Sequence, residues 1–133
     1  MSPARYVLDT DWVIHYLNGH PEIVAKVESL RTDGLAVSVV SLAELYEGVY
    51  YSATPEEDER GLEDFLALVE VIGLNATICQ VFGRERGKLR RQGRTVGDFD
   101  LLIAATCLHG GLTLLTNNRR HFEHIEGLTL ISS

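Results

Sequence analysis

The chain has 133 residues, of which 45% are apolar and 23% charged, and these values are ordinary for one globular domain. No apolar run approaches the roughly 20 residues that cross a bilayer, and the first residues, MSPARYVLDTDW, lack the apolar core of a signal peptide. We therefore expect a single domain over residues 1–133, located in the cytoplasm and not in a membrane. The net charge of −7 argues at first against a nucleic-acid partner.

Patterns typical of strands and helices alternate along the chain. Apolar and β-branched runs predict strands at residues 5–8, 35–40, 71–74, 112–116 and 128–131. Apolar residues at helical spacing, with capping residues or proline before them, predict helices that begin near residues 11, 21, 41, 55, 76, 101 and 118. This alternation favours an α/β fold with a mainly parallel central sheet. Ligands of such sheets bind at the carboxyl ends of the strands, so functional residues are expected there.

Several acids lie where a solvated surface charge is not expected. Asp9 follows the apolar run YVL, Glu44 has apolar flanks in SLAELYEGV, and Asp100 directly precedes LLIAA. Ordinary explanations stay open for each of them. A helix cap alone would explain Asp9, and a capping box with Ser41 at the helix start would explain Glu44. The dipole of the following helix would favour both Asp98 and Asp100.

A bound cation is one way to balance acids in such surroundings. Carboxylates set against apolar strands and helices are costly unless they are paired, capped or bound to a cation. No lysine or arginine is close in sequence to Asp9, Glu44 or Asp100, and none of the five histidines has an obvious metal-ligand spacing. Because all candidate ligands are oxygens, the pattern indicates Mg²⁺ or Mn²⁺ rather than Zn²⁺.

The order of these polar residues resembles the motifs of PIN-domain ribonucleases, and in particular of VapC toxins. LDTDWVIHYL resembles the first motif with Asp9, SVVSLAELYEGV the second with Glu44, and GDFDLLIAATCL the third with Asp100. LLTNNRRHFEHIEGLTL is similar to the closing motif, with Asn118 at its fourth polar position. The resemblance covers essentially the whole chain. It implies a PIN-like three-layer α/β/α fold and a Mg²⁺- or Mn²⁺-dependent endoribonuclease, dimeric and neutralised by a VapB-type antitoxin.

The resemblance also implies roles for the motif residues. Asp9 and Asp100 would hold the metal, and Glu44 would bind it through water or position the attacking water. Asn118 would complete the catalytic set, although an Asp is more usual at this position and Asn adds no charge. Supporting positions around the ligands are assigned to three residues: Thr10, Asp98 and Thr116. Asp100 is preferred to Asp98 as the ligand because of its spacing to LLIAA.

The basic residues are concentrated, although the protein as a whole is acidic. Six of the twelve lysines and arginines fall between residues 84 and 94, and two more follow Asn118. Such a segment can hold the phosphates of an RNA backbone, although a solvated helix face would give the same pattern. The predicted RNA-binding residues are Arg84, Arg86, Lys88, Arg90, Arg91, Arg94, Arg119 and Arg120.

Aromatic residues near Glu44 suggest a surface for a partner protein. We expect Trp12, Tyr46 and Tyr50 to contribute to it, because large rings with a polar edge are frequent at the energetic centres of interfaces. Ordinary packing in the core is the alternative for any one of them. The family resemblance implies that an antitoxin helix covers this surface and places a basic side chain in the acidic pocket.

Two other functions are weighed against the ribonuclease. The segment DTDWV fits the signature of haloacid-dehalogenase-like phosphatases, in which Asp9 would be a nucleophile. Those enzymes need a later lysine against the phosphate, and this chain has only Lys26 and Lys88, neither at a predicted strand end. A PIN-like binding module that has lost catalysis is the other alternative, and it is disfavoured because Asp9, Glu44 and Asp100 are all present.

Overall fold

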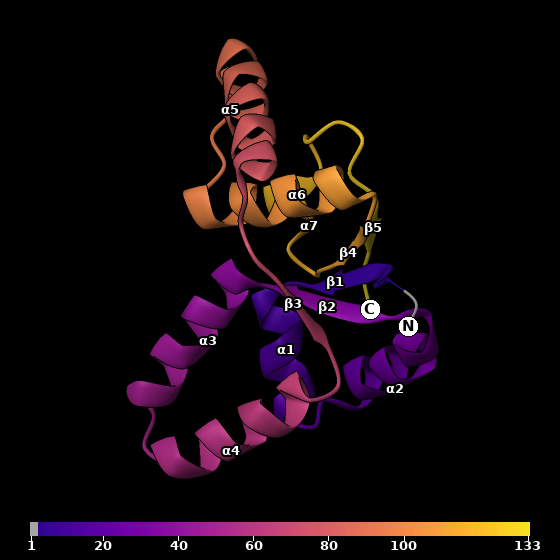
Figure 1. Cartoon of the computed structure of the whole chain (residues 1–133), viewed down its shortest axis with the longest axis vertical. Helices are drawn as coiled ribbons and strands as arrows, with labels where there is room; N and C mark the ends of the chain where they lie inside the picture. Colours follow the sequence, from indigo (N-terminus) through magenta and orange to yellow (C-terminus); the bar gives the residue numbers. More distant parts are fainter. Residues whose placement is uncertain (1–2) are drawn as a thin grey trace.

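A parallel sheet forms the centre of the computed structural model, which describes residues 3–133 (Figure 1). The strands are β1 (Tyr6–Leu8), β2 (Leu35–Ser38), β3 (Glu70–Ile72), β4 (Thr113–Leu115) and β5 (Leu130–Ile131). Their order is β3-β2-β1-β4-β5, and every neighbouring pair is parallel. The predicted α/β class and parallel sheet are therefore confirmed. Because β1 lies in the middle, its carboxyl end has a strand end on either side.

Helices cover both faces of the sheet (Figure 1). The helices are α1 (Thr10–Leu17), α2 (Pro21–Leu30), α3 (Val39–Tyr50), α4 (Pro55–Leu66), α5 (Ala76–Arg91), α6 (Asp98–Gly110) and α7 (Arg119–Phe122). A short 3₁₀ turn, Arg31–Asp33, follows α2. None of the helices in residues 3–133 combines the length and the apolar character needed to span a membrane.

Alternating side chains of the strands divide the core into two parts. Val7 and Leu114 pack in one cluster with residues of α5, α6 and α7. Leu8 and Leu115 point to the opposite face and pack with residues of α1, α2, α3 and α4. This alternation is what a strand with two buried faces requires, and it gives the three-layer α/β/α arrangement.

The start of α3 differs from the sequence prediction. The helix begins at Val39, and the side chain of Ser38 caps it by accepting a hydrogen bond from the backbone N–H of Val40 at 3.0 Å. The prediction that residues 39–40 continue the strand and that Ser41 caps the helix is wrong. Val40 is buried in the core cluster that contains Val7, and this packing outweighs the preference of a β-branched residue for a strand.

Candidate active site

Asp9 is held rigidly at the carboxyl end of the central strand. It directly follows β1, and only 3% of it is exposed. Its Oδ1 accepts a hydrogen bond from the backbone N–H of Thr10 at 2.9 Å, which caps α1. Its Oδ2 accepts one from Oγ1 of Thr116 at 2.7 Å, and Thr116 follows the neighbouring strand β4. Each carboxylate oxygen is therefore fixed by a different segment of the chain.

The environment of Asp9 opposes its negative charge. Burial raises the pKa of its carboxyl to about 6, although the hydrogen bonds from Thr116 and Thr10 lower it. The nearby negative charges of Asp100 and Asp11 raise the pKa further. Among residues 3–133, no lysine or arginine forms an ion pair with Asp9. The site therefore carries a charge that a cation would stabilise.

Glu44 reaches the same edge of the sheet from α3. Oγ1 of Thr10 donates a hydrogen bond to Oε1 of Glu44 at 2.7 Å and lies 2.9 Å from Oγ of the buried Ser41. Since Ser38 caps the helix, Glu44 is not the acid of a capping box, and that explanation of Glu44 is excluded. The supporting position assigned to Thr10 matches its contacts, because its backbone holds Asp9 and its side chain holds Glu44.

Asp100 and Asn118 complete the rim of the site through contacts that the sequence did not predict. Asp100 lies in the first turn of α6, and its Oδ2 is 2.9 Å from Nδ1 of His121 on α7. The side-chain amide of Asn118 donates to the carboxylate of Asp11, and its backbone N–H donates to Oγ1 of Thr116 at 3.0 Å. Asp11 therefore belongs to the same group of acids.

Asp98 points away from this group. Its carboxylate forms an ion pair with Arg86 of α5, and 79% of its side chain is exposed. Gly97, not Asp98, is the N-cap of α6. The expectation that Asp98 caps the helix is wrong, and its contact to α5 gives no support to a role beside the metal ligands. The charge of Asp98 is directed toward Arg86 instead.

The predicted RNA-binding residues separate into bound and free groups. Arg86 donates to the backbone carbonyl of Val96 at 2.8 Å as well as to Asp98, and only 17% of its side chain is exposed. The expectation that Arg86 contacts RNA is therefore wrong. Lys88 pairs with Glu85 at 3.2 Å, and Arg119 donates to Oγ of Ser132 at 3.0 Å. The remaining predicted residues are exposed, and they are Arg84, Arg90, Arg91, Arg94 and Arg120.

The aromatic residues expected at a partner surface behave differently from one another. Trp12 is fully buried, and its Nε1 donates to Oδ1 of Asn117 at 3.1 Å. The expectation that Trp12 meets a partner is therefore wrong, because its ring is part of the core. Tyr46 is half-buried and stacks on Tyr50, with ring centroids 6.1 Å apart. Tyr50 is 64% exposed and stays available at the surface.

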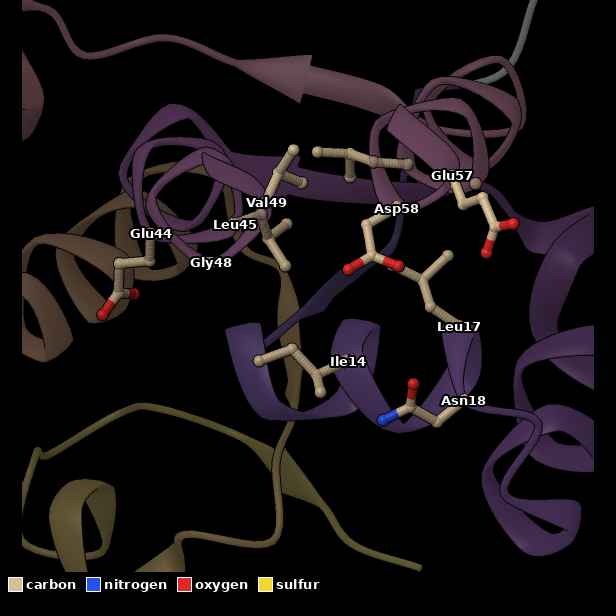
Figure 2. A pocket seen from close by; sticks show the side chains of 11 residues that line it. Ile14, Leu17, Asn18, Glu44, Leu45, Gly48, Val49, Glu57 and Asp58 are labelled. Atoms are coloured by element: carbon tan, nitrogen blue, oxygen red, sulfur yellow. The ribbon is translucent and has the colours of Figure 1, made fainter. Parts of the chain in front are cut away.

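Two adjoining pockets lie beside the acids. The first, of about 500 Å³, is formed between α1, α3 and α4 and includes the apolar side chains of Ile14, Leu17 and Leu45 (Figure 2). The second, of about 590 Å³, is lined by Thr10, Asp11, Ile14, Glu44, Glu47, Gly48, Tyr51 and Phe99. Ile14 and Glu44 line both, so an apolar groove continues into an acidic pocket.

The acids are near one another but do not form a tight ligand set. Across residues 3–133, no group of three His, Cys, Asp or Glu side chains is close enough to be identified as a metal-binding cluster. The carboxylates instead take hydrogen bonds from Thr10, Thr116 and His121. Their donor set is nevertheless oxygen-rich and suits a hard cation such as Mg²⁺ or Mn²⁺.

Sequence reasoning missed three residues of the site. Asp11 and His121 carry no local signal, since each meets its partner only after residues distant in the chain are folded together. Ser41 was assigned to a helix cap, and its buried position beside Thr10 depends on where α3 begins. A polar residue one helical turn before Glu44 was the available signal for Ser41, since positions three apart share a face.

Residues 6–128 match the PIN domain family, and the chain belongs to it. This match replaces the phosphatase alternative. Among the similar proteins are VapC ribonucleases. The chain is 35% identical over 124 residues to the tRNA(fMet)-specific endonuclease VapC of Shigella flexneri, which covers 93% of this chain and 94% of that protein. It is 35% identical over 127 residues to ribonuclease VapC2 of Rickettsia felis, covering 94% and 95%.

Solved structures of similar proteins agree with this membership. A structure of VapBC2 from Rickettsia felis bound to a promoter DNA fragment contains a chain that superposes with a TM-score of 0.91 at 33% identity, covering 96% of this chain and 98% of that one. A DNA-bound VapBC structure from Salmonella typhimurium gives a TM-score of 0.90 at 31% identity, covering 97% and 98%. The predicted PIN-like fold is thereby confirmed.

Proposed function

We propose that this chain is a metal-dependent endoribonuclease and the toxin of a toxin–antitoxin pair. The observation that carries the proposal is the gathering of Asp9, Glu44 and Asp100 at the carboxyl edge of a PIN-type sheet, without a lysine or arginine paired to them among residues 3–133. The names of the full-length relatives support ribonuclease activity and the toxin role. Because the proposed substrate is RNA, we place the protein in the cytoplasm.

The proposed cofactor is Mg²⁺ or Mn²⁺, held by Asp9 and Asp100 with Glu44 alongside. The raised pKa of Asp9 supports this assignment, because burial without a cationic partner makes its charged form costly. Each oxygen of Asp9 accepts one hydrogen bond and keeps a further lone pair for a cation. A single metal is the simpler proposal, because Asn118 contributes no charge and its amide is engaged by Asp11.

The chain would contribute position and proton binding to phosphodiester hydrolysis. A bound divalent cation supplies Lewis acidity, which activates water and stabilises charge on the phosphate. Oε1 of Glu44 is engaged by Thr10, so Oε2 is left to accept a hydrogen bond from the attacking water. Thr116 keeps Asp9 from rotating, and this preserves the geometry during the reaction. A binding module without activity would show no such cleavage.

The exposed arginines at the end of α5 are proposed to hold the RNA backbone. An Arg90→Gln/Arg91→Gln double variant should bind RNA more weakly, and the salt dependence of its affinity should fall by roughly one unit per lost phosphate contact. Fluorescence anisotropy with labelled RNA in EDTA, across a salt series, measures both quantities. Arg60→Gln on the acidic helix α4 is the matched control and should change neither. Unchanged affinity and slope in the double variant would favour a solvated helix face instead.

Several finer points stay proposals. The first substrate to test is initiator tRNA, because the Shigella relative is named for it. A homodimer is expected from the family resemblance. A single domain over the whole chain is likewise retained as a prediction, and the PIN match accounts for residues 6–128 of it.

We propose a VapB-type antitoxin as the partner, seated in the apolar groove between α1, α3 and α4. The groove offers Ile14, Leu17 and Leu45 to apolar side chains of a helix or extended segment (Figure 2). It continues toward Glu44 and Asp11, which favour a cationic residue at the end of that segment. The titles of the VapBC structures support a partner of this kind for the similar proteins.

Ile14→Ala should weaken the antitoxin without weakening catalysis. Ile14 is 43% exposed and lines both pockets, so its loss removes apolar contact area at the centre of the proposed interface. Truncation at such a position costs more than about 1 kcal/mol of binding free energy. The complex with the neighbouring small gene product can be tested by calorimetry. Leu74→Ala is the matched control, since Leu74 is 42% exposed and lies outside the groove.

A metal titration tests the cationic end of the same partner. If a basic antitoxin side chain occupies the acidic pocket, it competes with the cation for Asp9, Glu44 and Asp100. Inhibition of RNA cleavage should then weaken as Mg²⁺ or Mn²⁺ is raised. Equal inhibition at all metal concentrations, together with full affinity of Ile14→Ala, would place the partner elsewhere on the protein.

A further inference from the structure

His121 makes a specific contact to the acidic group from the far side of α6. Its Nδ1 lies 2.9 Å from Oδ2 of Asp100. An ionised carboxylate can only accept hydrogen bonds, so Nδ1 carries the hydrogen and donates it. The contact joins residues 21 positions apart in the chain. It therefore depends on the packing of α7 against α6 and not on local geometry.

The two proposed aspartate ligands are supported very differently. Asp9 accepts hydrogen bonds on both oxygens, from Thr10 and Thr116, and is almost completely buried. Asp100 has 28% of its side chain exposed, and His121 provides the only hydrogen bond to its carboxylate among residues 3–133. Without His121, this carboxylate would be free to rotate about its side-chain bonds.

The position of His121 is itself well determined. The next residue, Phe122, is fully buried in the core cluster of α5 and α6, which anchors the single turn of α7. The ring of His121 is tilted against that of Phe122, with centroids 6.4 Å apart. An exposed imidazole on an anchored backbone can therefore orient Asp100 while 57% of its own side chain faces solvent.

We propose that His121 is a positioning residue that holds Oδ2 of Asp100 and thereby leaves Oδ1 oriented to bind a divalent cation. This inference rests on the proposed metal-dependent function. Hydrogen-bond partners of metal ligands fix ligand orientation, and their loss commonly lowers metal affinity by about 10- to 100-fold. His121 acts on the metal only through Asp100 and makes no bond to the cation.

Direct measurement of Mn²⁺ binding tests this role apart from activity. His121→Ala should bind Mn²⁺ about tenfold more weakly than wild type, measured from the electron paramagnetic resonance signal of free Mn²⁺. His121→Asn should restore most of the affinity, because its amide nitrogen can donate from nearly the position of Nδ1. His124→Ala is the matched control, since His124 is a neighbouring exposed histidine that pairs with Glu123 instead.

Kinetics give a second readout. In His121→Ala, the Mn²⁺ concentration for half-maximal cleavage should rise, while the rate at saturating metal stays close to wild type. Wild-type affinity in His121→Ala, or an equal loss in His124→Ala, would overturn the role of His121 and leave the metal site standing. Failure of His121→Asn to recover affinity would overturn positioning through a donated hydrogen bond. Absence of saturable Mn²⁺ binding in wild type would overturn the metal site and this inference together.

Discussion

Asp9→Asn is expected to abolish metal-dependent RNA cleavage while making the metal-free protein more stable. The substitution removes a negative charge from the proposed metal site but hardly changes the side-chain volume. Its oxygen can still accept the hydrogen bond from the backbone of Thr10, and the hydroxyl of Thr116 can turn to accept from the new amide. The fold should therefore persist without the charge that binds the cation.

The stability gain follows from the raised pKa of Asp9. Its carboxyl has a pKa of about 6 in the folded protein and an ordinary value of 3.8. The folded state thus binds this proton more tightly than the unfolded state, and ionisation of Asp9 destabilises the fold. The penalty is fully present above pH 6, where it amounts to at most about 3 kcal/mol, and it disappears as the pH falls toward 4.

Denaturant unfolding in EDTA, at several pH values, measures this effect. Asp9→Asn should exceed wild type in unfolding free energy at pH 7 to 8, and the difference should vanish near pH 4. Asp64→Asn, on the exposed surface of α4, is the control and should do neither. Mg²⁺ should stabilise wild type but not Asp9→Asn. Wild-type cleavage by Asp9→Asn with added Mg²⁺ would show that the metal site has been assigned wrongly.

Asp100→Asn should be far more damaging to catalysis than Asp98→Asn, although the two acids are two residues apart. Asp100 contributes to the electrostatic environment of Asp9, whereas Asp98 is directed toward Arg86. Loss of a metal ligand removes several kcal/mol of transition-state stabilisation, which corresponds to a rate decrease of about a hundredfold or more. Loss of the exposed Asp98 charge should cost less than about 1 kcal/mol of folding stability and leave cleavage near wild type.

The two variants are matched in chemistry and in helix, so each controls for the other. Single-turnover cleavage at saturating Mg²⁺ measures the catalytic loss, and denaturant unfolding confirms that both variants are folded. If Asp98→Asn is the more damaging of the two, the metal ligand has to be moved from Asp100 to Asp98. Equal, small losses would remove α6 from the proposed catalytic site.

The sequence by itself determined the α/β class, the parallel sheet and the acids at its carboxyl edge. Strand periodicity and helix signals are local, and a residue that ends a central strand is brought to one edge by the chain direction alone. For that reason Asp9, Glu44 and Asp100 were found without coordinates. The family motifs agreed with this reading because they contain the same residues at the same strand and helix ends.

Tertiary structure decided which side chains are free to act. Arg86 and Trp12 resemble surface residues in the sequence, yet Arg86 is engaged by Asp98 and Trp12 by Asn117. The contact of His121 with Asp100 likewise depends on helices that pack only in the folded chain. Burial and pairing between distant residues set exposure and electrostatics, and local spacing contains no information about either.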